Sequence, residues 1–589
     1  MHVMLLFPPN WTPSMPHLAL PTLAAYLRGH GVQVTQRDLN IEVFDSILTR
    51  KHMQRSLERM RTLYGPRGDR TPKRHAIAPR DLVQWALAEG PRLIGQVERA
   101  KQTLRSEAFY DGPLGLQALT TVADALQLAS LPFYPAALEI STYKSALTPD
   151  SSRNILREVN DPEMNLLIEQ YQQGVLEDIK RLKPDLIGIS IPSLAQMTPG
   201  LTIAAQIKQL GLPCHITIGG PHITMLREAL ASNPAIFSLI DSAVIFDGEV
   251  PLLRLAQALE AGQDLSEVPN LIWRNGETIR VNQRKEPEKI ANLPIPDFDG
   301  LPLDRYLAPK LVLPLLSARG CYFGKCAFCN VGYGESEKIS LMSSDPLAEQ
   351  MLTLKRKYGV EQIFFCDEAL APRLLRDISR IMRQHDVPLL WGGCARFEKS
   401  LTPELLQQMY DGGCRMIMFG LESASEPIMQ RMVKGTTLDN MHRILEQSAA
   451  IGIWNHTFFF FGFPGETLDH AQETVNFLYT HKEHINSAGF GTFILEVDAP
   501  AHRYPHSFGI SKVITRPEQD LAIYFDYEVS EGMDAALAEQ VADRFIDVLP
   551  KKPYPQFYVN DVYRFLYACD LSRNGQRPPP WLVPQEALA

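Results

Sequence analysis

Short apolar runs and helical patterns alternate along the first 290 residues, except in one long stretch. Residues 3–7 are continuously apolar, and apolar side chains then recur at helical spacing over 20–27. From about residue 45 to 180 the chain is instead mainly helical and charged. Three further apolar runs then occur, each followed by a helical pattern, at 185–191, 215–218 and 242–246. The pattern predicts a doubly wound, Rossmann-like α/β domain over residues 1–285, with a helical insertion at about 45–180.

The loops that follow these strands form the expected ligand-binding edge of the first domain. In open parallel sheets, ligands lie beyond the carboxyl ends of the strands. The segments at that edge are residues 8–13, 192–198, 219–222 and 247–249. Two further runs with an Asn275–Gly276 turn between them predict a hairpin over about 270–281.

A proline-rich linker, predicted over residues 286–309, separates this domain from a second region of strand–helix alternation. Strands are expected near 313–318, 361–365, 389–394, 414–420, 456–461 and 488–495. Six strand–helix units predict a partial (β/α)6 barrel of the TIM type over residues 310–499, shorter than the closed eight-unit barrel. Residues 500–589 predict a small mixed region, and the end around Pro578–Pro580 is expected to fray.

Composition narrows the possible partners and the compartment. The formal net charge is −9 and the pI is near 6.0, so nucleic acid is a poor candidate partner. The apolar runs are far shorter than the ~20 residues that cross a bilayer. No Lys or Arg precedes the first apolar run, which therefore resembles a first strand and not a secretion signal. We expect a cytoplasmic protein without a membrane span, whose eight cysteines are reduced.

Three cysteines directly follow the first predicted strand of the second domain: Cys321, Cys326 and Cys329. Three thiols within nine residues can face a single metal centre. A closed structural zinc site needs a fourth ligand, and no Cys or His pair of matching spacing supplies it. An iron–sulfur cluster with four irons and three thiolate ligands leaves one iron open to an exchangeable ligand. Three structural or zinc-bound cysteines remain the alternative.

This segment resembles the cluster-binding loop of the radical S-adenosylmethionine (SAM) superfamily. That family has three residues between its first two cysteines and two between the last pair, whereas this chain has four and then two. Phe328 supplies the aromatic residue that the family has before its last cysteine. The resemblance covers roughly residues 310–495 and implies a [4Fe–4S] cluster held by Cys321, Cys326 and Cys329, with SAM as the second cofactor.

Later strand ends are similar to the segments with which this family holds SAM. The resemblance implies these contacts: Asp367 or Glu368 for the methionine amino group, Glu422 and Ser423 for the ribose, and Gly462 and Glu466 for the adenine. A carboxylate suits an ammonium group, but the sequence does not choose between Asp367 and Glu368. Each segment alone could equally be a polar residue that caps a strand. Their occurrence in order, at one edge of the barrel, favours the cofactor interpretation.

The first domain resembles the cobalamin-binding module of some radical SAM enzymes. The resemblance rests on Leu6–Pro9 and on residues 184–190, 218–222 and 247–249. It implies the following cobalamin contacts: Pro9, Ser193, Gly219, Gly220, Gly248 and Glu249. The chain lacks an Asp-x-His-x-x-Gly signature, and His222 has the wrong neighbours for it, so no protein imidazole is expected below the cobalt. A domain that binds another ligand, or none, is the alternative.

Together these patterns predict a cobalamin-dependent radical SAM enzyme that methylates an unactivated carbon of a natural product, peptide or lipid. One rival is a non-methylating enzyme of the same architecture that cyclises or rearranges its substrate. A second rival is a non-catalytic iron–sulfur or zinc protein with a ligand-sensing domain. The expected partners are a small-molecule or peptide substrate and an electron donor such as flavodoxin or ferredoxin. No catalytic residue beyond the cofactor contacts is identified.

Overall fold

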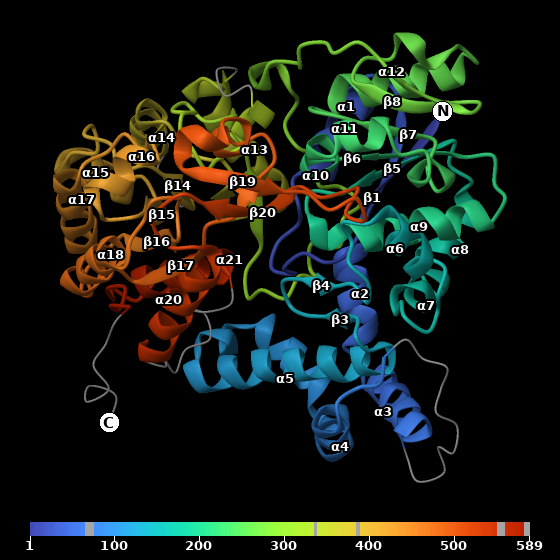
Figure 1. The fold of residues 1–589 in the computed structure, drawn as a ribbon, viewed down its shortest axis with the longest axis horizontal. Coiled ribbons are helices and arrows are strands. Elements are labelled where there is room, and N and C mark those ends of the chain that lie inside the picture. Colours follow the sequence, from blue (N-terminus) through green and yellow to red (C-terminus); the bar gives the residue numbers. More distant parts are fainter. Residues whose placement is uncertain (65–75, 335–338, 385–388, 550–559, 582–589) are drawn as a thin grey trace. The chain divides into compact units, whose positions relative to one another are not determined.

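The chain divides into two compact units. The computed structural model describes residues 1–64, 76–334, 339–384, 389–549 and 560–581. Unit 1 comprises residues 1–288, 292–310 and 516–522, and unit 2 comprises 289–291, 311–515 and 523–589 (Figure 1).

Unit 1 is built on a mixed sheet with the strand order β2-β1-β5-β6-β7-β8-β9. Its strands are β1 (His2–Phe7), β2 (Gln33–Asp38), β5 (Leu186–Ser190), β6 (His215–Gly219), β7 (Ser242–Val244), β8 (Leu271–Asn275) and β9 (Thr278–Val281). The first five in this order are parallel, and β8 and β9 form the predicted antiparallel hairpin. Strand β2, which follows β1 in sequence, pairs with one edge of β1, and β5, which follows later in sequence, pairs with the other edge. The boundary between β1 and β5 is therefore the topological switch point, where such sheets bind ligands.

The central strands of this sheet are buried on both faces, which explains their continuous apolar sequence. All five residues of β5 are buried, as are all of β1 except His2. Five helices join the parallel strands or pack beside them: α1 (Ala19–Gly29), α9 (Met197–Gln209), α10 (Pro221–Met225), α11 (Arg227–Ala231) and α12 (Glu249–Glu260).

The segment between β2 and β5 is mostly helical. Its elements are α2 (Leu39–Ile47), α3 (Arg50–Tyr64), α4 (Arg80–Leu104), α5 (Gly112–Ser130), β3 (Ala137–Leu138), β4 (Tyr143–Lys144), α6 (Ser152–Glu158), α7 (Leu167–Gln172) and α8 (Val175–Leu182). At its start, Asp38 caps α2 by accepting hydrogen bonds from the amides of Asn40 and Ile41. The Tyr306 hydroxyl donates to the other oxygen of Asp38 at 2.6 Å, and this buried bond ties the segment after the sheet back to β2.

Unit 2 contains a parallel sheet with the order β10-β13-β14-β15-β16-β17. Its strands are β10 (Val312–Leu315), β13 (Gln362–Phe365), β14 (Leu390–Ala395), β15 (Cys414–Glu422), β16 (Trp454–Phe461) and β17 (Ser487–Thr492). Within the described residues β10 and β17 do not pair, so the barrel is open. The predicted partial (β/α)6 barrel is thus confirmed. Its helices are α13 (Ser344–Tyr358), α14 (Pro372–Gln384), α15 (Pro403–Asp411), α16 (Glu426–Arg431), α17 (Leu438–Ile451) and α18 (Leu468–Thr480).

The region after β17 has its own small sheet and packs back onto the barrel. Strands β18 (Leu495–Glu496), β20 (Tyr524–Val529) and β19 (Ile510–Ile514) form this sheet, and β11 (Ala318–Arg319) pairs with β12 (Ser340–Leu341) elsewhere in the unit. The accompanying helices are α19 (Pro500–Arg503), α20 (Ala535–Val548) and α21 (Asp561–Arg573).

Helix α21 covers one face of the barrel sheet. A Cβ on Gly392 of β14 would lie 3.1 Å from the Phe565 ring of α21. The neighbouring Trp391 points the opposite way, because successive strand residues face opposite sides, and its Nε1 donates to Gly412 O at the end of α15. Helix α21 and helix α15 therefore lie on opposite faces of β14.

The prediction of a frayed end near Pro578–Pro580 is wrong. The Asn486 side-chain amide donates to Pro579 O at 2.8 Å, and Trp581 N donates to Ile485 O at 2.7 Å. The Trp581 side chain is 6% exposed and packs near Phe459 and Phe545. A buried indole and two backbone-directed hydrogen bonds anchor this segment to the loop before β17, which sequence composition alone does not reveal.

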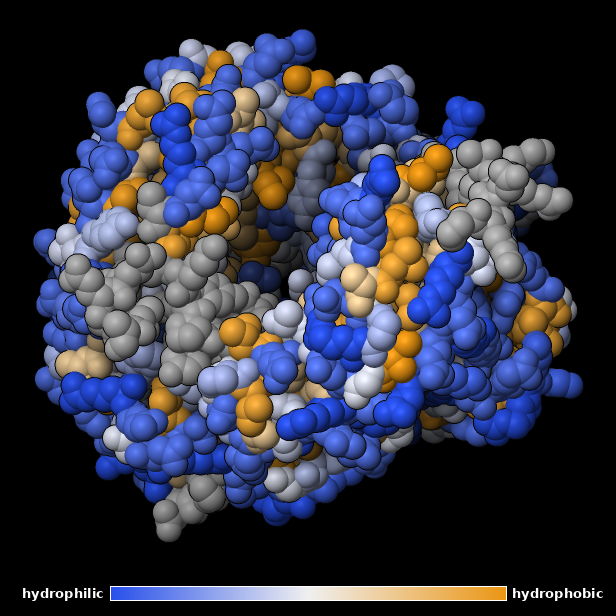
Figure 2. All heavy atoms as spheres, turned by 90° about the horizontal axis from the view of Figure 1, so that it is seen from below, coloured by the Kyte–Doolittle hydropathy of each residue, from blue (hydrophilic) through white to orange (hydrophobic). Residues whose placement is uncertain are grey.

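The surface shown in Figure 2 is mostly hydrophilic, with hydrophobic side chains in scattered groups. Among the described residues, no helix has the length and apolar character needed to cross a membrane.

Candidate functional site

The cysteine loop follows β10 and β11 at the carboxyl end of the barrel strands. All three thiols, Cys321, Cys326 and Cys329, are free and partly buried. Burial is the main cause that raises the pKa of Cys329 to about 12, and the nearby Glu368, Cys326 and Cys321 contribute to this rise. The three sulfur atoms are thus close enough to interact electrostatically. Deprotonating three buried thiols is unfavourable unless positive charge replaces the protons. The iron ions of a cluster would provide that charge, so the three thiols suit an iron–sulfur cluster.

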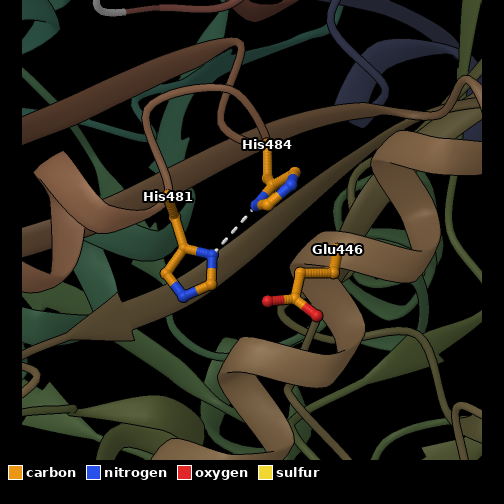
Figure 3. Close-up of side chains that lie close together, drawn as sticks. All are labelled: Glu446, His481 and His484. Atoms are coloured by element: carbon orange, nitrogen blue, oxygen red, sulfur yellow. Dashed lines mark hydrogen bonds between the residues drawn. The ribbon is translucent and has the colours of Figure 1, made fainter.

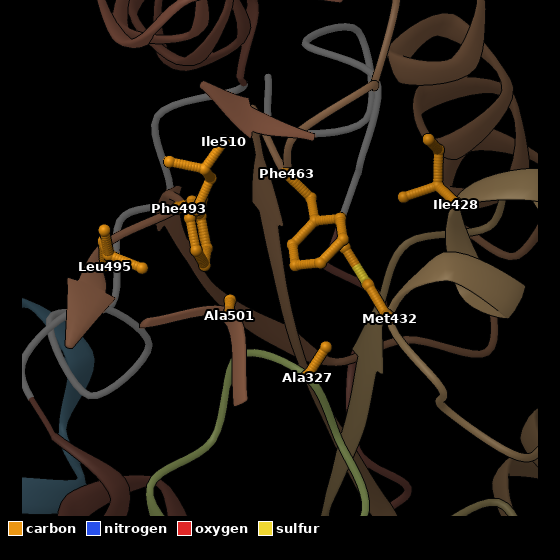
Figure 4. Close-up of a cluster of buried hydrophobic side chains, with 8 residues drawn as sticks. All are labelled: Ala327, Ile428, Met432, Phe463, Phe493, Leu495, Ala501 and Ile510. Carbon is orange, nitrogen blue, oxygen red and sulfur yellow. The ribbon is translucent and has the colours of Figure 1, made fainter. Parts of the chain in front are cut away.

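The loop is held in place through Ala327, between the last two cysteines. Ala327 N donates to Met432 O at 2.9 Å, and Ala501 N donates to Ala327 O at 2.8 Å. Its methyl group is fully buried in the hydrophobic cluster drawn in Figure 4, where Met432 and Phe463 lie closest to it in the view. The cluster consists of Ala327, Ile428, Met432, Phe463, Phe493, Leu495, Ala501 and Ile510. Hydrogen bonds to two distant segments of the chain and packing in this cluster therefore hold the cysteine loop at Ala327.

The aromatic residue next to the last cysteine also belongs to this packing. Phe328 packs at the edge of the cluster, with its ring centroid 5.2 Å from that of Phe460. Lys434 Nζ lies 5.7 Å from the centre of the Phe328 ring. Phe328 thus separates the cysteine loop from β16 and contacts a buried cation.

Two cations beside the loop were not foreseen from the sequence. Arg396, directly after β14, has its Nη1 3.7 Å from Cys326 Sγ, and its guanidinium stacks on Phe323 at 3.7 Å. Lys434 also lies near Cys326, and the two cations oppose the rise in the Cys326 pKa that burial causes. Arg396 stands at the carboxyl end of a predicted strand, a position that could have marked it as a site residue.

Asp367 and Glu368 follow β13, and their carboxylates have different surroundings. Ser317 donates to Asp367 from its amide, at 3.0 Å, and from its hydroxyl. Burial raises the Asp367 pKa to about 6 although these hydrogen bonds lower it. Desolvation by the surrounding protein also raises the pKa of Glu368. The negative charge of Glu368 in turn raises the pKa values of Cys329 and Glu496. Asp367 thus holds the segment that leads into the cysteine loop, whereas the exposed Glu368 carboxylate raises the pKa of Cys329.

The end of β15 contains a buried ion pair and a hydrogen-bonded serine. Lys434 Nζ lies 2.9 Å from Glu422 Oε1, and both side chains are almost completely buried. Ser423 Oγ lies 3.3 Å from Thr474 Oγ1 and accepts a hydrogen bond from Ser425 N at 3.2 Å. Ser423 therefore bonds to the protein itself, whereas the buried Ser425 Oγ has no partner among the described residues.

The turn after β16 depends on Gly462 and Glu466. Gly462 has a φ of +84°, and a Cβ there would lie 2.4 Å from that of Ala538, so both its conformation and its packing require glycine. Gly462 N donates to Glu466 Oε2 at 2.5 Å. The Glu466 side chain is fully buried, and burial raises its pKa to about 7. Its Oε1 has no partner in the described structure, as expected of a polar atom beside a ligand site.

The loops at the switch point of unit 1 contain the other predicted residues, which lie at four strand ends: Pro9, Ser193, Gly219, Gly220, Gly248 and Glu249. Gln196 Nε2 donates to Pro8 O at 2.7 Å and joins the loops after β5 and β1. Gly220 has a φ of +117°, and a Cβ there would lie 2.7 Å from Ile191 O. Packing within the protein therefore already requires Gly220, whether or not a ligand approaches it.

Two buried polar side chains at this edge lack partners in the described part of the chain. They are Asn10, at Oδ1, and His222, at both ring nitrogens. Burial lowers the His222 pKa to about 4, so the ring is neutral at pH 7. Unsatisfied buried polar atoms are uncommon in folded proteins, and these two fit an edge that receives a polar ligand.

Part of the chain is similar to the Radical SAM superfamily. Residues 315–478 match the sequence profile of the Radical SAM superfamily, which confirms the resemblance inferred from the cysteine loop. This range begins at β10 and ends within α18.

A curated relative of the chain carries the name of a methyltransferase. This is the "Uncharacterized methyltransferase PH0819" of Pyrococcus horikoshii, which is 28% identical over 305 residues. The match covers 51% of this chain and 65% of the relative.

Two solved structures have a similar fold. The cobalamin-dependent SAM radical enzyme OxsB, with aqua-cobalamin bound, matches 93% of this chain and 67% of its own with a TM-score of 0.58 and 15% identity. The radical SAM methyltransferase TsrM of Kitasatospora setae, with cobalamin and a [4Fe–4S] cluster bound, matches 92% of this chain and 87% of its own with a TM-score of 0.54 and 14% identity. At such low identity the likeness concerns the fold, and it agrees with the predicted α/β class.

Proposed function

We propose that this chain is a cobalamin-dependent radical SAM enzyme that methylates an unactivated carbon of a natural product, peptide or lipid. The observation that carries the proposal is the three-cysteine loop at the carboxyl edge of an open six-strand barrel. Carboxylates and cations lie around that edge, and a second sheet with the topology of a ligand-binding domain precedes it. The methyltransferase relative and the two cobalamin-bound structures support the reaction and the second cofactor.

Cys321, Cys326 and Cys329 would hold the cluster. A [4Fe–4S] cluster bound there would supply one electron for the reductive cleavage of SAM to methionine and a hydrogen-abstracting radical. The protein itself must fix the cysteines and keep water away from the reacting groups. The buried hydrophobic side chains around Ala327 support both tasks, because they exclude water and hold the cysteine loop in place.

Glu368 would hold the methionine ammonium group of SAM. This choice is supported by the position of Asp367, whose oxygens already accept hydrogen bonds from Ser317. Glu368 is close enough to Cys329 to influence its pKa, as a residue that binds SAM beside the cluster must be. The SAM carboxylate needs a cation, and Arg396 and Lys434 next to Cys326 are the candidates.

Adenine and ribose would lie along the ends of β15 and β16. Glu422 would contact the ribose, and Gly462 and Glu466 would contact the adenine. The unsatisfied Glu466 Oε1 supports a polar contact there. The Ser423 hydroxyl already has partners within the protein, so the neighbouring Ser425 is the better candidate for a ribose contact.

Cobalamin would bind at the switch point of unit 1. A bound cobalamin would supply the methyl group that is transferred to the substrate carbon. Pro9, Ser193 and the Gly219–Gly220 turn would form part of the edge that receives it, together with Gly248 and Glu249. The unsatisfied Asn10 and His222 side chains support a ligand at this edge. A small-molecule or peptide substrate and a flavodoxin- or ferredoxin-type electron donor complete the proposal.

Anaerobic reconstitution with iron, sulfide and hydroxocobalamin tests this function. We expect about four irons and about one corrin per chain, and, under strong reduction, release of 5′-deoxyadenosine and S-adenosylhomocysteine from SAM. Replacing Cys329 with Ala should abolish iron retention and SAM cleavage. Replacing Cys214, a free cysteine of unit 1, should change neither.

The outcomes separate the rival functions. With a substrate, methyl-deuterated SAM should raise the product mass; an unchanged mass would exclude methylation and favour cyclisation or rearrangement. Retention of iron without corrin would contradict the cobalamin assignment alone. A fully loaded protein that never cleaves SAM would overturn the enzymatic proposal and favour a sensing role.

A further inference from the structure

A group of metal-ligating side chains lies in the barrel domain away from the cysteine loop. Glu446 of α17 and His481 and His484, which follow α18, each offer a ligand atom, and these atoms all lie within 4.8 Å of one another. Figure 3 shows the Glu446 carboxylate on the helix, directed toward the two imidazoles on the turn.

The spacing of the two imidazoles already suits a shared ion. His481 Nδ1 lies 3.1 Å from His484 Nδ1. Nitrogen ligands with zinc bonds of about 2.0 Å are about 3.3 Å apart at a tetrahedral centre. The Glu446 side chain is exposed, and its carboxylate oxygen lies within 4.8 Å of the ligand nitrogens of both histidines.

The other nitrogen of His481 also has a partner. His481 Nε2 contacts His442 Nδ1, one turn before Glu446 on the same face of α17. A histidine that binds metal through one nitrogen is usually oriented by a hydrogen bond at the other. His442 can provide that bond, because its Nδ1 already contacts Nε2 of the buried His481.

The turn that carries His481 and His484 is rigidly attached to the barrel. Asn455 of β16 donates from Nδ2 to His484 O at 2.8 Å, and its amide donates to Asn486 Oδ1 at 2.7 Å. A site whose ligands are fixed before the ion arrives loses less entropy on binding. Side chains that merely coincide on a surface would lack this support.

The position of the group distinguishes it from the cysteine site. His481 and His484 precede β17, so they lie at the amino edge of the barrel strands, whereas the cysteine loop follows the carboxyl end of β10. Because all six strands run parallel, the two sites lie at opposite edges of the sheet.

We propose that Glu446, His481 and His484 bind a divalent transition-metal ion, zinc by the chemistry of the ligands, with His442 orienting His481. Two imidazoles and one carboxylate are an established zinc ligand set, with the fourth position open to water. The ion joins α17 to the turn before β17. It lies at the edge opposite the cysteines and is therefore separate from the cysteine site.

Zinc retention by the cluster-loaded protein tests this proposal. Reconstituted protein, with its cysteines occupied by iron, is incubated with zinc and desalted, and metal is counted by mass spectrometry. We expect about one zinc per chain, and X-ray absorption with nitrogen and oxygen at about 2.0 Å and no sulfur at about 2.3 Å. Glu446→Gln and His484→Ala should each weaken binding about tenfold or more.

The exposed His506 provides the matched control, and His506→Ala should retain zinc like the wild type. Circular dichroism shows whether each variant is folded, and Glu446→Gln alters only an exposed side chain. Equal zinc retention by the wild type and by both ligand variants would overturn the proposal, as would a sulfur shell around the zinc. Neither result depends on SAM cleavage, so this test is independent of the proposed function.

Discussion

Asp367 and Glu368 are adjacent in sequence, but only the fold distinguishes their roles. Asp367 is hydrogen-bonded to Ser317, whereas the exposed Glu368 carboxylate raises the pKa of Cys329. Glu368→Gln should therefore weaken SAM binding by about ten- to a hundredfold, the loss of one charge-assisted hydrogen bond, without loss of iron. Equilibrium dialysis with SAM and an iron assay measure both quantities.

Asp367→Asn provides the comparison for that prediction. It should lower the free energy of unfolding by about 1–3 kcal/mol, because the Ser317 amide and hydroxyl lose a charged acceptor. If Asp367→Asn weakens SAM binding more than Glu368→Gln does, the assignment of the two carboxylates is reversed.

Glu466 should make stability depend on pH. Its pKa is about 7 in the folded chain, above the ordinary value of 4.5, because it is buried. Between these values the unfolded chain loses the proton and the folded chain keeps it. The stabilisation from protonated Glu466 is therefore fully present below pH 4.5 and is lost as pH rises through 7, by about 3–4 kcal/mol at about 1.4 kcal/mol per pKa unit.

Urea unfolding of the metal-free chain at pH 5 and pH 8 measures this effect. Glu466→Gln cannot ionise, so its stability should fall less between the two pH values than that of the wild type. The exposed Glu473 on α18 is the control, and Glu473→Gln should follow the wild type. Parallel curves for wild type and Glu466→Gln would contradict the prediction.

At the scale of elements, α18 begins immediately after the turn that contains Gly462 and Glu466. Thr467 caps this helix by accepting a hydrogen bond from His470 N, and the His470 ring accepts one from Thr467 N. Thr467→Ala should lower the free energy of unfolding by about 0.5–2 kcal/mol, because the His470 amide in the first turn loses its side-chain acceptor. Thermal or urea unfolding measures the loss.

Thr480, at the other end of α18, is the matched control. Its hydroxyl donates only to Asn476 O of the same helix, at 2.9 Å, and the residue is exposed. Thr480→Ala should change stability by less than Thr467→Ala. Equal effects would indicate that the cap does not stabilise the turn.

At the scale of the whole molecule, the two candidate cofactor sites belong to different units. The cysteine loop lies in unit 2, and the loops at the switch point lie in unit 1. Cys329→Ala should therefore abolish iron binding and leave corrin binding within about twofold of the wild type, because separate sites usually act additively. Optical titration with hydroxocobalamin measures corrin binding, and an iron assay measures iron binding. Loss of both cofactors together would contradict separate sites.

The sequence by itself determined the elements and the donor set of the cysteine site. Hydrophobic runs located the strands of the open barrel, because a buried parallel strand must be apolar over its whole length. The three cysteines lie within nine residues, so their proximity needs no information from the rest of the chain. The residues beyond the cysteines that hold SAM and cobalamin remain predictions from resemblance.

Tertiary structure decided everything that depends on contacts between distant segments. Arg396 follows β14 and Lys434 follows α16, and the two residues meet only when the chain folds. Likewise, the group of His481, His484 and Glu446 requires the docking of α17 against the turn before β17. Hydrophobic periodicity records which face of an element is buried, but not which polar group a buried side chain meets. That choice depends on the packing of the whole chain, and it decides the electrostatics of both sites.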